Sequence, residues 1–129
     1  MYDFMQFKLP KNTEKYEWTQ HAVIKMKQYG LTAQRILRVV KNPQKVEEGI
    51  VKNTIAVMQP SSFSTKDGKR VWNREIWAMY QIKRKVQNAK LKTFGAQRIR
   101  LISAWRYPGV SPKRDPIPEE ILRELESML

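Results

Sequence analysis

The sequence TQHAVIKMKQYGLTAQRILRVVK, residues 19–41, decides the fold. Thr19 and Thr32 each precede a run of apolar residues at helical spacing, and threonine is a preferred N-cap because its hydroxyl accepts a backbone hydrogen bond. Gly30 follows the first run, and glycine commonly ends a helix because it adopts left-handed backbone angles without strain. The predicted helices span residues 20–29 and 33–41. Their short connection predicts a helical hairpin.

Strand-like segments flank this hairpin on both sides. Alternating or β-branched apolar residues are typical of strands, and the turn sequence Lys-Asp-Gly-Lys at residues 66–69 separates two of them. The predicted strands span residues 2–9, 49–59, 71–82 and 97–107, with a polar connector at 11–17 and a basic loop at 83–92. Pro118 and two glutamates begin a last helix. The order β-α-α-β-β-β-α predicts an α+β fold in which the helical hairpin packs on a mostly antiparallel sheet.

Charge is divided unevenly along the 129 residues. The first 114 carry 24 Lys and Arg against seven Asp and Glu, a net charge of +17, whereas the last 15 carry five acidic residues against Arg123 alone. We predict an α+β domain over residues 1–110, then a proline-rich linker and an acidic helix over 111–129. The apolar face of that helix needs cover, so we expect it to pack on its own sheet or a twofold partner's, with its acids near the rim of a basic groove. A domain so basic repels itself unless a polyanion compensates, which favours RNA or the ribosome as partner.

The composition excludes several kinds of site. The chain has no cysteine and one histidine, so it offers few ligands for a transition metal, and we expect no metal and no cofactor. No apolar run approaches the ~20 residues that cross a bilayer. The basic residues are spread over every segment, whereas polybasic membrane binders concentrate them on one helix or tail. We therefore expect a cytoplasmic protein with no membrane partner.

The strand at residues 97–107, QRIRLISAWRY, carries the clearest signal for phosphate binding. Because side chains alternate along a strand, three arginines are predicted on one face, and guanidinium groups bind phosphate through paired hydrogen bonds without deprotonating. A solvated outer face of the sheet is the alternative interpretation. Arg74 and Tyr80 share a face of the neighbouring strand and suit the same groove. The predicted nucleic-acid-binding residues are Lys25, Arg74, Tyr80, Arg98, Arg100 and Arg106.

His21 is the one side chain whose unperturbed pKa lies near neutrality. At the start of a helix the dipole disfavours imidazolium, so the pKa is expected to favour the neutral form that accepts a proton. Lys25 and Gln28 fall on the same helix face. The alternative is a capping or packing role, which is the commoner fate of a lone histidine in a small domain.

The segment at residues 19–32, with Ile36-Leu37 and Asn42-Pro43 after it, resembles a group of small bacterial and phage domains. Their helical hairpin opens with His-Ala, a basic residue and Met, and turns at Gly-Ile/Leu-Ser/Thr. That group is similar to the RelE/ParE-like toxins, including the BrnT branch. The resemblance implies a toxin-like ribonuclease, or a relative that binds ribosome, RNA or gyrase. It also implies that the RNA-cleaving members rely for catalysis on Lys, Arg, Tyr and sometimes His instead of a metal. The positions that match are His21 and Lys25 in the hairpin and Arg98, Arg100, Arg106 and Tyr107 in the basic strand. The basic loop at 83–92 and the acidic tail depart from the pattern.

Two function hypotheses follow. The first is a toxin-like, metal-independent endoribonuclease (mRNA interferase-like), in which a 2′-OH attacks the adjacent phosphate while side chains move protons and hold the phosphate charge. Its predicted catalytic residues are His21, Arg100 and Tyr107. The second is a non-catalytic RNA- or DNA-binding module, with a phage or mobile-element protein that binds a host protein as a further alternative. The remaining expected partners are an acidic antitoxin protein and a second copy of the chain, in a homodimer.

Overall fold

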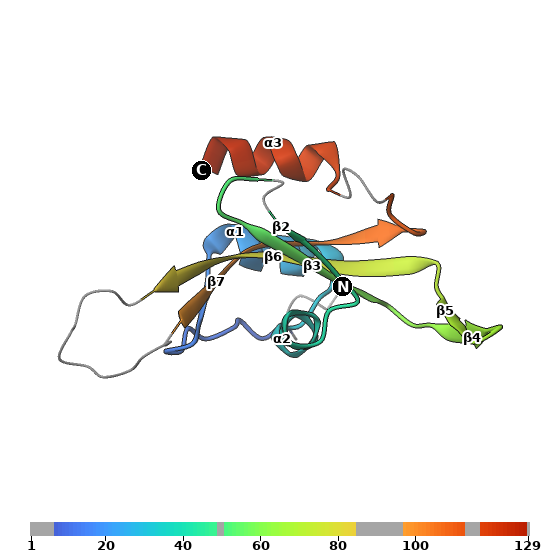
Figure 1. Cartoon of the computed structure of the whole chain (residues 1–129). Helices are drawn as coiled ribbons and strands as arrows, with labels where there is room; N and C mark the ends of the chain where they lie inside the picture. Colours follow the sequence, from blue (N-terminus) through green and yellow to red (C-terminus); the bar gives the residue numbers. More distant parts are fainter. Residues whose placement is uncertain (1–6, 49–50, 85–96, 113–116, 129) are drawn as a thin grey trace.

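The computed structural model describes residues 7–48, 51–84, 97–112 and 117–128, and Figure 1 shows their arrangement. A five-stranded sheet has the order β1-β7-β6-β3-β2, and all its neighbouring strands are antiparallel except β1 and β7. Its strands are β1 (Tyr16–Trp18), β2 (Lys45–Glu48), β3 (Ile55–Pro60), β6 (Arg74–Arg84) and β7 (Gln97–Pro108). A separate two-stranded sheet consists of β4 (Ser64–Lys66) and β5 (Lys69–Val71). The helices are α1 (Gln20–Tyr29), α2 (Ala33–Lys41) and α3 (Glu119–Met128). The predicted α+β class is confirmed.

The helical hairpin has the predicted bounds and caps. The Thr19 hydroxyl accepts a hydrogen bond from the backbone N–H of Ala22, and Thr32 caps α2 in the same way, each at 3.1 Å. Gly30 has a φ of 65° and closes α1 in the left-handed conformation. Both helices are therefore set by residues within one turn of their ends.

Several predicted strand bounds are wrong. The strand predicted over residues 71–82 is β6, which starts at Arg74 and continues to Arg84, whereas Val71 belongs to β5. Residues 1–6 lie outside the described residues, residues 7–9 are not in a strand, and the first strand is β1, partly inside the segment predicted as a connector. The strand predicted over residues 49–59 begins only at Ile55, and the unpredicted β2 pairs with it. The predicted basic loop falls mostly on residues 85–96, which the structure does not describe. Three- and four-residue strands carry too little alternation to be recognised, and pairing with a neighbouring strand defines them.

Two cores cover the two faces of the sheet. Figure 1 shows α3 on one side of the sheet and α2 on the other. The α1–α2 hairpin buries Met26, Ile36 and Val39 against one face. On the opposite face α3 buries Ile121 and Leu125 against a pair of tryptophans whose rings stack 5.7 Å apart, Trp77 and Trp105. The acidic helix therefore packs on its own sheet, as expected from its apolar face. None of the three helices in the described part of the chain is long and apolar enough to cross a membrane.

Candidate nucleic-acid interface

A β-bulge in β7 separates the three arginines that were predicted on one face. Tyr80 pairs with Leu101 and Met79 pairs with Ser103, so Ile102 is an extra residue in β7. Leu101 and Ala104 consequently contact the core under the helical hairpin, although they are three residues apart. Simple alternation fails beyond this point because one additional residue shifts the phase of every side chain that follows.

Arg106 therefore lies on the hairpin face, and Arg98 and Arg100 lie on the other face; the prediction of one shared face is wrong. Arg106 donates from Nε to the carbonyl oxygen of Tyr29 at 2.7 Å, at the end of α1. Arg98 and Arg100 lie beside Glu17 of β1, with Arg100 Nε 3.2 Å and Arg98 Nη1 3.7 Å from its carboxylate oxygens. Glu17 therefore neutralises part of the positive charge on that edge of the sheet.

His21 and Lys25 share a face of α1, as predicted, but α3 covers that face. The Lys25 side chain is only 2% exposed, and its Nζ lies 2.7 Å from Oε1 of Glu124 and 3.0 Å from Oε1 of Gln28. His21 Nε2 is 4.0 Å from the same Glu124 oxygen. Burial lowers the pKa of His21 below its ordinary value and Lys25 lowers it further, while Glu124 opposes both effects. Lys25, predicted to bind nucleic acid, is thus engaged by the protein's own carboxylates.

The structure does not bring the predicted catalytic set together. Arg100 and Tyr107 are seven residues apart on β7, a span of about 23 Å at the usual rise of a strand, and they lie on either side of the bulge. Tyr107 packs at the edge of the core under α3. Arg74 is exposed at the start of β6, whereas Tyr80 is half-buried toward its other end, where burial raises its pKa. These residues do not form one groove.

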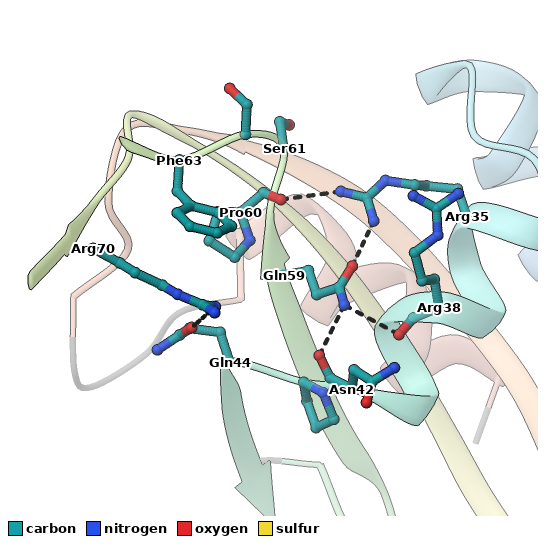
Figure 2. Close-up of a pocket in the computed structure, with 11 residues that line it drawn as sticks. Arg35, Arg38, Asn42, Gln44, Gln59, Pro60, Ser61, Phe63 and Arg70 are labelled. Carbon is teal, nitrogen blue, oxygen red and sulfur yellow. Dashed lines mark hydrogen bonds between the residues drawn. The ribbon is translucent and has the colours of Figure 1, made fainter. Parts of the chain in front are cut away.

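A cavity between α2 and the β4–β5 hairpin gathers three other arginines (Figure 2). We call it the arginine cavity. It has a volume of about 450 Å³, and its described lining includes Arg35, Arg38 and Arg70 but no Asp or Glu. The β4–β5 hairpin projects from one end of the sheet (Figure 1), and this hairpin forms one wall of the cavity.

Gln59 fixes the wall of the cavity beneath α2. Arg35 donates to the Gln59 side-chain oxygen and, at 3.0 Å, to the carbonyl oxygen of Pro60. The Gln59 amide nitrogen in turn donates to the carbonyl oxygens of Arg38 and Asn42, which are acceptors near the end of α2 (Figure 2). Burial lowers the pKa of Arg35, and the positive charges of Arg38 and Arg106 lower it further. An anion placed here relieves repulsion between cations that the fold already holds close together.

Arg70 approaches the cavity from the opposite side. The predicted turn at residues 66–69 is confirmed, with positive φ at Asp67 and Gly68, and it folds β4 onto β5. The Arg70 guanidinium lies 4.2 Å above the ring of Phe63, and its Nη1 donates to the side chain of Gln44 at 3.1 Å. Phe63 is 49% exposed. A guanidinium and an exposed aromatic ring are thus presented together.

Sequence reasoning missed the arginine cavity because its members come from separate segments. Arg35 and Arg38 are three residues apart on the polar face of α2, a spacing that is ordinary for a solvated helix surface. The signal that was available is the basic composition of α2 and of the β4–β5 hairpin. In the described ranges, no three His, Cys, Asp or Glu side chains gather closely enough to hold a metal ion.

Comparison with known proteins assigns no family to this chain. No family model matches it, and neither the curated proteins nor the solved structures include a match. The similarity to RelE/ParE-like toxins therefore stays a prediction from the hairpin motif, and the candidate site stands on its own geometry.

Proposed function

We propose that the protein binds RNA, and that the arginine cavity holds its phosphates. The observation that carries the proposal is the convergence of three guanidinium groups, from Arg35, Arg38 and Arg70, on one cavity without an acidic residue in its described lining. Guanidinium forks bind phosphate oxygens through paired, charge-assisted hydrogen bonds. The net charge of +13 adds long-range attraction for a polyanion.

The predicted sites at Arg98 and Arg100 and at Lys25 are weaker candidates, because carboxylates already lie against these cations. The Glu17 carboxylate forms ion pairs with Arg98, Arg100 and Lys83. The Glu124 carboxylate forms one with Lys25. Exchanging an internal carboxylate for a phosphate gains less than placing a phosphate where no carboxylate is present. The arginine cavity is therefore the preferred first contact for nucleic acid.

Binding without cleavage is favoured over the endoribonuclease hypothesis. His21, Arg100 and Tyr107 are spread over three places in the fold, whereas proton transfer requires groups within hydrogen-bond reach of one phosphate. The nuclease activity, the acidic antitoxin, the homodimer and the host-protein partner stay predictions. An RNA ligand agrees with the cytoplasmic location expected from the sequence.

Salt-dependent binding tests the proposal. Fluorescence anisotropy with a labelled RNA strand at several KCl concentrations should give a slope of log affinity against log salt of roughly −3.5, for about five neutralised phosphates. The double variant Arg38→Gln, Arg70→Gln should bind at least ~10-fold more weakly and reduce the slope by about two. The matched control is Lys11→Gln, Lys52→Gln, which removes the same charge from exposed positions outside the cavity.

Two outcomes contradict the proposal. A flat salt response shows that phosphates do not govern the interaction, and equal losses in both double variants show that the cavity is not the site. Total RNA incubated with the protein in EDTA tests the nuclease hypothesis separately. Discrete cuts with 2′,3′-cyclic phosphate ends would establish metal-independent cleavage, whereas intact RNA agrees with a binding module.

A further inference from the structure

A second cavity adjoins the arginine cavity and shares the residues Ser62 and Phe63 with it. We call it the aromatic cavity. It has a volume of about 390 Å³, and Phe63, Val71 and Trp72 provide its apolar surface. Phe63 and Val71 are 49% and 42% exposed, so a small apolar patch lies directly beside a concentration of positive charge.

We propose that the aromatic cavity takes an unpaired nucleobase whose neighbouring phosphate lies in the arginine cavity. The preferred ligand is then single-stranded nucleic acid. The inference rests on the proposed function and specifies its substrate class. Because Ser62 and Phe63 line both cavities, the two binding positions adjoin, as a base and a phosphate of one strand require. The Phe63 ring contacts the Arg70 guanidinium, and about half of the residue stays exposed.

The second aromatic residue is held rigidly. Trp72 Nε1 donates to Oε2 of the buried Glu75 at 2.7 Å, while Trp77 Nε1 donates to the other carboxylate oxygen at 2.9 Å. The backbone N–H of Ser111 donates to the same carboxylate at 3.2 Å. A ring fixed in this way loses little conformational freedom when a ligand stacks on it, so more of the contact energy contributes to affinity.

The polar residues of the aromatic cavity suit a base better than an aliphatic side chain. Ser62, Ser64 and Asn73 line it beside the rings and offer hydrogen-bond donors and acceptors to a base edge. In a duplex the faces of the bases are stacked and their pairing edges are occupied. Only a base that is free of a pairing partner can enter such a cavity, and stacking on aromatic side chains is the usual mode of single-strand recognition.

Matched oligonucleotides separate the base contact from the phosphate contacts. The probes are a labelled 12-nucleotide RNA, the same strand with its central bases replaced by abasic sites, and the corresponding duplex. The abasic strand keeps every phosphate of the normal strand. The normal strand should bind about ten-fold more tightly than the abasic strand, in the range expected for loss of base stacking, and more tightly than the duplex.

The variant Phe63→Leu identifies the stacking residue. It should reduce the preference for the normal strand over the abasic strand. The abasic strand should lose less affinity than the normal strand, because the variant removes a ring and no charge. Leu9→Ala is the control, because Leu9 is exposed and lies outside both cavities. A 2-aminopurine at the central position should lose fluorescence on binding the native protein and lose less of it with Phe63→Leu; circular dichroism checks that the variant is folded.

The outcomes distinguish the inference from the proposed function. Salt-dependent binding of equal strength to all three probes overturns the inference and leaves the phosphate site intact. Preference for the duplex, or unchanged discrimination in Phe63→Leu, also overturns it. Failure of all three probes to bind overturns the proposed function and the inference together.

Discussion

The ion pair between Lys25 and Glu124 makes a sharp prediction about stability, because its two members differ in exposure. The Lys25 side chain is 2% exposed and the Glu124 side chain is 36% exposed, with 2.7 Å between Nζ and Oε1. Replacing Glu124 with Gln leaves a buried ammonium group with Gln28 at 3.0 Å and a more distant carboxylate, that of Glu120, at 3.8 Å. Replacing Lys25 with Met keeps the methylene packing and leaves a carboxylate on a side chain that is one-third exposed, although its Oε1 is buried.

The expected magnitudes follow from this asymmetry. Removing one partner of a fully buried ion pair costs about 3–5 kcal/mol of stability. We expect a smaller cost, about 2 kcal/mol, for Glu124→Gln, because Glu124 is partly exposed and Lys25 keeps other partners. Lys25→Met should change stability by less than about 1 kcal/mol, because the ammonium no longer has to be desolvated. With ~2.1 cal/mol/K of unfolding entropy per residue, 1 kcal/mol corresponds to about 4 °C in the Tm of a chain this long.

Urea unfolding followed by tryptophan fluorescence, with thermal melts by circular dichroism, measures both effects. Glu126→Gln is the control, since Glu126 is exposed on the same helix, and it should leave the Tm unchanged. The double variant Lys25→Met, Glu124→Gln should resemble Lys25→Met alone. A loss of stability in Lys25→Met equal to or larger than that in Glu124→Gln would refute the reasoning, because it would mean that the ion pair outweighs the desolvation of Lys25.

Two further predictions concern carboxylates inside the basic fold. Burial alone would raise the pKa of Glu75, but hydrogen bonds from Ser111, Trp72 and Trp77 outweigh it and lower the pKa below its ordinary value. Glu75 therefore stabilises the fold above the pKa of an unfolded glutamate, and that stabilisation is lost as pH falls through the lower, folded pKa. Glu75→Gln should cost about 2 kcal/mol of stability at pH 7. In urea titrations it should make stability less dependent on pH between 5 and 3, and an unchanged pH dependence contradicts this assignment. Arg100→Ala removes a partly exposed ion pair with Glu17, so the Tm should fall by no more than about 4 °C. Its RNA affinity should fall less than that of the double variant Arg38→Gln, Arg70→Gln. Unfolding of the Arg100→Ala protein, or a larger loss of affinity, would show that Arg100 has been misassigned.

The sequence by itself determined the elements whose signals are local. Thr19, Gly30 and Thr32 act on backbone groups within one turn, so they define the bounds of α1 and α2 without help from the rest of the chain. The Asp-Gly turn likewise defines the β4–β5 hairpin, and the apolar spacing of α3 required that it pack on a sheet. The excess of basic residues indicated a polyanionic partner, which is a property of the composition and not of the fold.

Only the tertiary structure decided which charges are available and where they gather. The bulge at Ile102 depends on pairing with β6, and it moves Arg106 to the opposite face from Arg100. The approach of Glu124 to Lys25 depends on α3 crossing back over the sheet from a distant part of the chain. The arginine cavity likewise forms from α2, which ends at Lys41, and from the β4–β5 hairpin, which begins at Ser64. The face of the sheet on which a side chain lies, and the carboxylates that pair with a cation, depend on residues that are close in space but distant in sequence. No local sequence pattern therefore predicts either of them.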